Sequence, residues 1–176
     1  MIIWIDGVNG VGKSSVAASL EEKLNDKNAE YIESDLYWLD MIKTNFVKAL
    51  SGFEPSGNKF FLETLKTTIE EKMDVDGKLP IVSFSLVNPL CESELINYFI
   101  EKDCPMVHII LEASKATIFE RIENDPIRDE AAQREQKNKV EDQMKYLNKN
   151  YPDAIRINTE NKSIEDVVDE IVKKYL

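Results

Sequence analysis

Residues 7–14 read GVNGVGKS, which fits the pattern G-x-x-x-x-G-K-[ST] of a phosphate-binding loop. A short apolar run at residues 2–5 precedes this segment and predicts a buried strand, and residues 14–24 predict a helix. Strand, glycine-rich loop and helix therefore follow one another in the order that such a loop requires. The alternative is an ordinary glycine-rich turn before a helix, which requires neither the lysine nor the serine at these positions.

The residue types in this segment suit the phosphates of a nucleotide. Gly7, Gly10 and Gly12 carry no side chain, so backbone N–H groups can turn inward toward phosphate oxygens. The helix is expected to begin near Lys13, and its unpaired N–H groups favour an anion there. We expect Lys13 to reach the β- and γ-phosphates of ATP and the Ser14 hydroxyl to bind Mg²⁺. The residues of this segment expected to contact the nucleotide are Gly7, Asn9, Gly10, Val11, Gly12, Lys13, Ser14 and Ser15.

Composition limits the class of protein. The chain of 176 residues can form one domain with a core and has little room for a second, so residues 1–176 are expected to be a single domain. A formal net charge of −11 argues against nucleic acid or an anionic membrane as a partner, because both require a basic patch. No charged leader precedes the first strand, so we expect no signal peptide. Cys91 and Cys104 lack metal-ligand spacing, which favours a reduced, cytoplasmic protein.

Strands and helices are expected to alternate along the chain. Apolar runs predict strands at residues 2–6, 30–33, 80–86, 106–111 and 154–157. Four groups of apolar residues have helical spacing, and each predicts a helix with one apolar stripe; the last of these helices has Ser163 as its expected N-cap. The stripes are Phe60, Leu62, Leu65 and Ile69; Leu95, Ile96, Phe99 and Ile100; Ile118, Phe119 and Ile122; and Ile164, Val167, Val168, Ile171 and Val172. This alternation predicts a three-layer α/β P-loop fold, in which helices cover both faces of a five-stranded parallel sheet. The site should lie at the carboxyl ends of the strands.

Two long segments depart from this simple alternation. Residues 36–78 are rich in aromatic side chains, and we expect an insertion that binds the acceptor; extra helices with their own core are the alternative. Residues 124–150 are highly charged, and we expect residues 124–136 to form a mobile lid that brings arginine to the phosphates. The alternative for this second segment is a solvated helical face.

The chain resembles the P-loop small-molecule kinases of the nucleoside-monophosphate-kinase-like group, and within them the tunicamycin-resistance family of ATP-binding relatives. The resemblance is carried by residues 1–5 with the loop that follows, by residues 113–117 with Arg121 behind them, and by residues 161–167. The middle third of the chain does not share it. The resemblance implies the P-loop kinase fold, ATP and Mg²⁺ as cofactors, and a small-molecule acceptor.

Residues 33–35, Glu-Ser-Asp, are similar to the acid-Ser-Asp at the end of strand two in shikimate kinases. The similarity implies that Asp35 contacts the acceptor hydroxyl and that Glu33 lies near the Mg²⁺ waters. Independently, a carboxylate at the end of a neighbouring parallel strand points into the phosphate crevice, where it can accept a hydroxyl proton. The alternative is that Ser34 or Asp35 only caps the next helix.

Two arginines complete the expected site. Similar kinases stack an arginine of the helix after strand four on adenine, and touch the transferred phosphate with an arginine of the lid. The resemblance implies these roles for Arg121 and Arg128, respectively. A guanidinium group suits both tasks, because it is planar and forms bidentate phosphate contacts. The alternative for either residue is a surface ion pair, which contributes little.

One departure from the kinase pattern concerns the metal. Residues 80–86 contain no Asp, so the acid that commonly holds Mg²⁺ on strand three is missing. Magnesium would rest on Ser14, the nucleotide phosphates and water, with help from Glu33, Asp35 or Asp6. His108, the only histidine, is expected to lie in the core on strand four.

Three functions are compatible with these residues. The leading hypothesis is an ATP- and Mg²⁺-dependent kinase that phosphorylates a hydroxyl of a small molecule, with an antibiotic as one candidate. A nucleotide-dependent protein that sequesters a toxic ligand without turnover is the rival, which the missing acid keeps open. A nucleoside or nucleotide kinase is the third.

Overall fold

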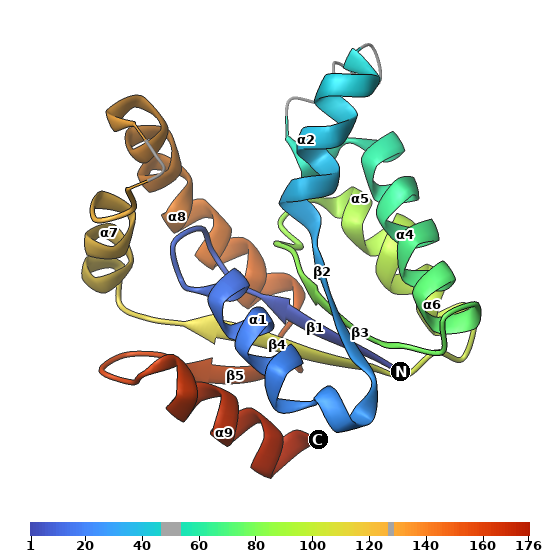
Figure 1. Ribbon diagram of the computed structural model, residues 1–176. Coiled ribbons are helices and arrows are strands. Elements are labelled where there is room, and N and C mark those ends of the chain that lie inside the picture. Colours follow the sequence, from blue (N-terminus) through green and yellow to red (C-terminus); the bar gives the residue numbers. More distant parts are fainter. Residues whose placement is uncertain (47–53, 127–128) are drawn as a thin grey trace.

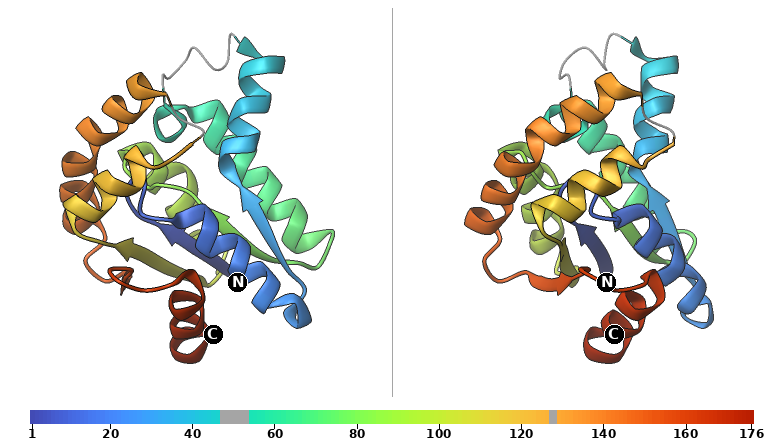
Figure 2. Two further views of the ribbon diagram at one scale, coloured as in Figure 1. Left: turned by 60° about the vertical axis from the view of Figure 1, so that its left-hand side comes forward. Right: turned by 90° about the vertical axis from the view of Figure 1, so that its left-hand side faces the viewer.

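The computed structural model describes residues 1–46, 54–126 and 129–176. Within them, five parallel strands form one sheet in the order β2-β3-β1-β4-β5 (Figure 1). The strands are β1 (Ile2–Asp6), β2 (Ala29–Glu33), β3 (Leu79–Ser83), β4 (Met106–Glu112) and β5 (Ile155–Asn158). Helices lie on both faces of the sheet, as the two views in Figure 2 show. The α/β fold expected from the sequence is therefore confirmed.

Helices connect each strand to the next. They are α1 (Lys13–Lys23), α2 (Ser34–Thr44), α4 (Lys59–Asp74), α5 (Pro89–Cys91), α6 (Asn97–Glu101), α7 (Lys115–Glu123), α8 (Glu130–Asn150) and α9 (Ile164–Tyr175). Short 3₁₀ turns occur at η1 (Asn25–Lys27) and η2 (Pro55–Gly57), and η3 (Glu92–Ile96) is a π-helix. No helix in the described ranges combines the length and the apolarity that a membrane span requires.

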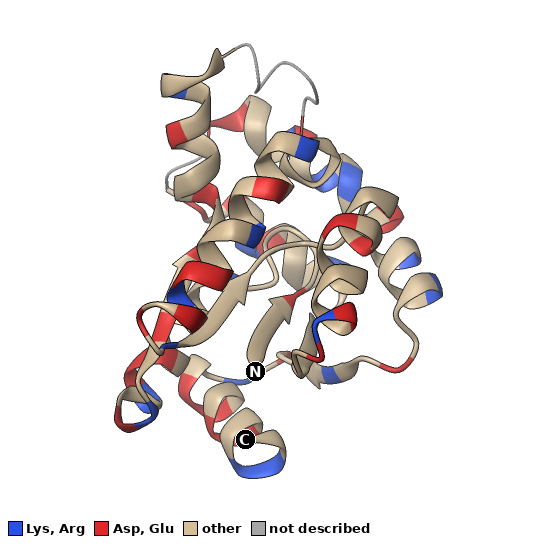
Figure 3. Cartoon of the chain, turned by 90° about the vertical axis from the view of Figure 1, so that its right-hand side faces the viewer, with Lys and Arg blue, Asp and Glu red and all other residues tan. Residues whose placement is uncertain are grey.

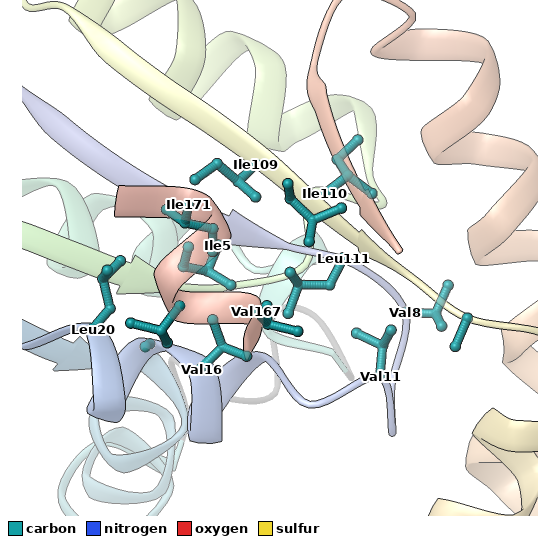
Figure 4. Packing of buried hydrophobic residues seen from close by; sticks show 14 of the residues in the cluster. Ile5, Val8, Val11, Val16, Leu20, Ile109, Ile110, Leu111, Val167 and Ile171 are labelled. Carbon is teal, nitrogen blue, oxygen red and sulfur yellow. The ribbon is translucent and has the colours of Figure 1, made fainter. Parts of the chain in front are cut away.

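The core consists of two apolar clusters, which share the buried side chains of the sheet between them. Because successive strand residues point to opposite faces, Ile3 and Ile5 of β1 join one cluster, and Ile2 and Trp4 join the other. The first, which we call the α1-side cluster, also includes residues of α1, α7, α8 and α9. Figure 4 shows its packing around Ile5. The second, the α4-side cluster, includes residues of α2, α4, α5, η3 and α6.

The helices between β2 and β3 belong to the α4-side cluster. Met41 of α2 and Phe61 of α4 are buried with Ile32 and Val82 of the sheet. The Trp38 ring lies edge-on against Phe61, with 5.4 Å between ring centroids. The described helices of residues 36–78 therefore cover the sheet directly and do not have a separate core of their own.

Three residues of the expected apolar stripes are exposed. The Asn58 side chain accepts a hydrogen bond from the Phe61 backbone N–H and so sets the start of α4. Phe61 is buried and Phe60 is 45% exposed, although Phe60 and not Phe61 was expected in the apolar stripe. Ile100 and Ile164 are also exposed, at 63% and 48%. The Ser163 N-cap of α9 is confirmed as part of a capping box with Asp166.

The third strand ends earlier than expected. It was expected to reach residue 86, but β3 ends at Ser83, which pairs with Ile5 on one side and Glu33 on the other. After Ser83 the chain leaves the sheet, and the Leu86 N–H turns to the Asp6 carboxylate at 3.2 Å. An apolar run alone does not separate strand residues from the buried turn that follows them.

Charged side chains lie mainly on the helices. Figure 3 shows both signs of charge interspersed on the face that it presents, with acidic residues on several helices around the sheet. With the formal net charge of −11, this distribution fits a solvated acidic surface.

Candidate nucleotide-binding site

The glycine-rich loop connects β1 to α1 at the carboxyl end of the sheet (Figure 1). Gly12 is the N-cap of α1 and has the left-handed φ of 105°, which glycine adopts readily. No side chain caps this helix, so the first N–H groups of α1 remain for an anion. Ser14 and Ser15 are exposed in this first turn.

Lys13 folds back over the loop. Its Nζ donates hydrogen bonds to the backbone oxygens of Gly7 at 3.0 Å and Val8 at 3.1 Å. These contacts keep the ammonium group beside the loop and hold it close to the N-terminus of α1. A bound phosphate would offer the same group stronger, charge-assisted hydrogen bonds.

Asp6 anchors the start of the loop. Its buried carboxylate accepts hydrogen bonds from the N–H groups of Gly7 at 2.6 Å and Leu86 at 3.2 Å, both through Oδ1. Its Oδ2 lies 3.0 Å from His108 Nε2. Both oxygens thus have partners, so Asp6 is a poor candidate for the metal. His108 lies in β4 as expected, but it is only partly buried, and its ring packs edge-on against Tyr151.

Two residues that the sequence did not indicate also hold the loop. The Ser85 hydroxyl donates to the Gly7 backbone oxygen at 2.8 Å. The Gln143 Oε1 atom accepts a hydrogen bond from the Asn9 N–H at 3.2 Å, and Gln143 is buried although it lies on α8. The Asn9 amide, expected to face the phosphates, therefore has a protein partner. A contact between residues 134 positions apart leaves no local signal in a sequence.

The loop packs tightly against α7 at one glycine and is open at another. A Cβ atom placed on Gly10 would lie 2.5 Å from Ile122 Cγ1, and the φ of Gly10 is 78°. A Cβ atom on Gly12 would meet nothing within 4 Å. The approach of α7 to the loop thus depends on the absence of a side chain at Gly10.

Replacing these two glycines separates packing from backbone strain. We predict that Gly10→Ala lowers the free energy of unfolding by about 1–3 kcal/mol more than Gly12→Ala does, because overpacking adds to a strain that both variants share. Urea unfolding of the two variants and the wild type measures this difference. Equal destabilisation would contradict the close contact with Ile122.

Arg121 lies beside the loop. Its guanidinium group donates to the Val11 backbone oxygen at 3.0 Å and to the side-chain and backbone oxygens of Thr159, just after β5, at 3.0 and 3.1 Å. These bonds join the loop, α7 and the segment after β5. Val11 itself has a buried side chain, so its backbone is the part available to a ligand.

The acidic residues after β2 lie at the same end of the sheet. Glu33 ends β2 in register with Ser83 of β3, and Asp35 is exposed in the first turn of α2. The buried Ser34 hydroxyl donates to the Ser83 backbone oxygen at 2.7 Å. No side chain caps α2, so the capping alternative for Ser34 and Asp35 is wrong. The Asp35 carboxylate lies on the surface, open to a ligand.

The metal would have few protein ligands. Among the described residues, no group of three or more His, Cys, Asp or Glu side chains could hold a metal ion. An exposed serine hydroxyl at Ser14 and the acid Glu33 at the end of β2 still fit Mg²⁺, which commonly binds through one or two protein oxygens together with substrate phosphates and water. Both cysteines are free, and burial raises the pKa of the Cys91 thiol to about 12.

The expected lid is described only in part. Arg128 lies outside the described residues, so the structure does not test its expected contact with the transferred phosphate. Helix α8 begins at Glu130, after an Asp129 side chain that caps it. Lys139 of α8 forms an ion pair of 2.7 Å with Glu54, which precedes η2. This pair joins α8 to the segment between β2 and β3.

The described part of the lid is expected to respond to nucleotide. The buried residues of α8 are Val140, Gln143 and Leu147, so the first part of this helix, residues 130–139, has no buried side chain. Because a helix end with so few buried contacts opens easily, we predict that the amides of residues 129–136 exchange faster without an ATP analogue than with it. Hydrogen exchange measures this, with the amides around Leu147 as the control. Equal, strong protection in both states would show a permanent helix.

Comparisons with known proteins agree with this geometry. No protein-family model matches the chain, and no curated protein matches its sequence. Solved structures do match. The tunicamycin resistance protein of Deinococcus radiodurans superposes with a TM-score of 0.71 and 17% identity, over 98% of this chain and 94% of its own.

Two metabolic kinases superpose almost as well. A gluconokinase from Sinorhizobium meliloti 1021 has a TM-score of 0.63 and 16% identity, over 97% of this chain and 89% of its own. The shikimate kinase from Bacteroides thetaiotaomicron has a TM-score of 0.64 and 17% identity, over 98% of both chains. The chain therefore has the fold of the P-loop small-molecule kinases, which confirms the fold that the sequence resemblance implied. Among these relatives in fold, the sequence had already indicated resemblance to the tunicamycin-resistance family and, at residues 33–35, to shikimate kinases.

Proposed function

We propose that this protein is an ATP- and Mg²⁺-dependent phosphotransferase that acts on a hydroxyl of a small molecule. The observation that carries the proposal is the loop at residues 7–14, in which Lys13 and the uncapped start of α1 meet at one point. A positive side chain and a helix N-terminus that no side chain caps suit, in this arrangement, the β- and γ-phosphates of a nucleotide. Asp35 is exposed at the same end of the sheet, where an acceptor would approach.

Each proposed site residue has one task. The backbone of residues 7–15 and Lys13 bind the phosphates, and Arg121 stacks on adenine. Ser14 and Glu33 hold Mg²⁺, directly and through water respectively. When bound, this ion neutralises charge on the phosphates. Asp35 accepts the proton of the acceptor hydroxyl as that oxygen attacks the γ-phosphorus, while the bond from this phosphorus to the β–γ bridging oxygen breaks and ADP leaves.

The arginine of the lid is the last member of the proposed site. Arg128 would touch the transferred phosphate, because a guanidinium group can pair with two phosphate oxygens at once. Residues 124–136 would close over the nucleotide and exclude water from the reaction. Residues 36–78 would bind the rest of the acceptor.

The comparisons and the charge support the proposed class of acceptor. Similarity in fold to a gluconokinase and a shikimate kinase supports a hydroxylated small molecule. Similarity to a tunicamycin resistance protein supports an antibiotic as one candidate acceptor. The net charge of −11 disfavours nucleic acid and anionic membranes, and we propose a cytoplasmic location.

One observation favours a second candidate function. The last residue of β3 is Ser83 and not an acid, so the Mg²⁺ site has no carboxylate from this strand. A protein that binds a nucleotide and sequesters a toxic ligand without turnover would tolerate this loss. A nucleoside or nucleotide kinase is a further alternative from the same fold class.

A screen of many acceptors with detection of ADP separates these functions. Turnover of a sugar-like or drug-like alcohol supports the proposed kinase, and turnover of nucleosides supports the third candidate. Binding of a ligand without ADP release supports sequestration. The Lys13→Ala variant, run in parallel, reports any ADP formed by a contaminating enzyme.

A further inference from the structure

One polar side chain interrupts the buried face of α8. The buried residues of this helix, which is described over its whole length, are Val140, Gln143 and Leu147; they are three and four positions apart and so share one face. Val140 and Leu147 belong to the α1-side cluster, and Gln143 is only 8% exposed between them. A buried carboxamide is unfavourable unless it is hydrogen-bonded, so the partner of Gln143 indicates what this residue does.

The partner is the backbone of the phosphate-binding loop. The Gln143 Oε1 atom accepts a hydrogen bond from the Asn9 N–H at 3.2 Å. Beside this bond, the buried side chain of Val8 lines a small cavity together with Met144 and Leu147 of α8. Helix α8 therefore holds the loop at two consecutive residues, through apolar packing at Val8 and through a hydrogen bond at Asn9.

The N–H groups of the loop divide into two sets. Those with a protein acceptor are the N–H groups of Gly7, Asn9 and Val11. In the described ranges, no protein acceptor contacts the N–H groups of Gly10 and Gly12, which lie between and after them. Alternate N–H groups are thus committed to the protein, and those of the two glycines remain for phosphate oxygens.

We propose that Gln143 is a positioning residue for the nucleotide: by holding the Asn9 N–H from α8, it fixes the loop with the N–H groups of Gly10 and Gly12 available to the phosphates. This inference rests on the proposed function. Gly10 has a φ of 78°, and glycine turns freely between such conformations unless its neighbours are held. A loop that is ordered before the nucleotide arrives binds it more tightly, because no binding energy is lost in ordering it.

Gln143→Met tests this role because methionine is unbranched and suits an apolar stripe but has no carboxamide oxygen. Without this acceptor the Asn9 N–H can turn to water, and the phosphates must then reorder the loop as they bind. We expect calorimetry to show an affinity for MgATP about tenfold lower than that of the wild type, an effect typical of one lost hydrogen bond to a buried group.

The matched control is Asn148→Leu on the same helix. This change also removes a carboxamide oxygen, but that oxygen accepts a hydrogen bond from Arg156 at 2.8 Å and not from the loop. The control should therefore bind MgATP as the wild type does. A similar loss of affinity in both variants would show a general effect of disturbing α8 and would overturn the role of Gln143.

Amide hydrogen exchange of the wild type, followed by NMR, gives a second test that needs no variant. We expect the Asn9 amide to be protected both without and with an ATP analogue that is not hydrolysed, because its acceptor belongs to the protein. The amides of Gly10 and Gly12 should gain protection only with the analogue. An Asn9 amide that became protected only when the analogue was added would overturn the inference.

Failure of this inference and failure of the proposed function give different results. If the wild type did not bind ATP, the proposed function would fall, and this inference with it. If the wild type bound ATP and the Gln143→Met variant, shown to be folded by thermal unfolding, bound it equally well, only the inference would fall. Gln143 would then join α8 to the loop without serving the nucleotide. The exchange measurement on the wild type carries the test if the variant does not fold.

Discussion

Lys13→Ala is expected to lower the affinity for ATP about hundredfold while the protein remains folded. The ammonium group bonds to the backbone oxygens of Gly7 and Val8, and in the proposed complex it would bond to phosphate oxygens. Charge-assisted hydrogen bonds contribute about 1.5–3 kcal/mol each, and a tenfold change in affinity corresponds to about 1.4 kcal/mol. Loss of the side chain also removes the positive charge that balances the β- and γ-phosphates.

Calorimetry with MgATP measures this effect, and Lys23→Ala is its matched control. Lys23 lies in the last turn of the same helix and forms an exposed ion pair with Asp169. An exposed pair of this kind contributes little to stability, so the control should bind ATP as the wild type does. Affinity of Lys13→Ala within about threefold of the wild type, or ~0.65 kcal/mol, would show that the loop does not bind phosphate.

The parts of the fold that the sequence predicted well are those with local causes. An apolar run, a loop of glycines and a helix lie next to one another from residue 2 to residue 23, and their order alone defines β1, the loop and α1. The Ser163 cap of α9 is local in the same way, because the cap and its partner Asp166 are three residues apart. Alternation of strand and helix then leaves few possible topologies.

The parts that it missed depend on contacts between distant residues. His108 and Asp6 lie on neighbouring strands, and only the pairing of β1 with β4 brings them together. Gln143 and Asn9 are likewise far apart in the sequence, and only the folded chain brings them into hydrogen-bond contact. Tyr31 and Ser83 are an ordinary aromatic and an ordinary hydroxyl residue in the sequence. The contact of 2.7 Å between their hydroxyl groups becomes visible only when β2 and β3 are paired.

Errors within single helices have a different origin. Phe60 and Phe61 are adjacent and equally apolar, and the expected stripe included the wrong one of the two. Phe61 lies four residues before Leu65 and eight before Ile69, about one and two helical turns, so it shares their buried face. Phe60 lies five and nine residues before them and points away, so stricter use of the helical spacing would have placed Phe61 inside.

Asp35→Asn is expected to lower turnover at least about 10²-fold, the effect typical of a lost general base, and to leave ATP binding unchanged. Asparagine has the size of aspartate, but its amide does not act as a base. The attacking hydroxyl would therefore have no group at this position to take its proton. The side chain is exposed and α2 has no side-chain cap to lose. Stability should fall by no more than about 0.3–1 kcal/mol, the contribution of one negative charge at a helix N-terminus.

The matched control for this variant is Asp40→Asn, the same change at an exposed position of the same helix. Once the acceptor screen provides a substrate, steady-state rates and calorimetry with ATP are measured for both variants. A slow reaction in Asp35→Asn with normal ATP affinity, and normal rates in Asp40→Asn, would identify Asp35 as the base. If Asp35→Asn phosphorylated the acceptor at a near wild-type rate, the proton would have to leave by another route. The proposed mechanism would then lose its base, although the assignment of the phosphate-binding loop would still stand, because it depends on Lys13 and not on Asp35.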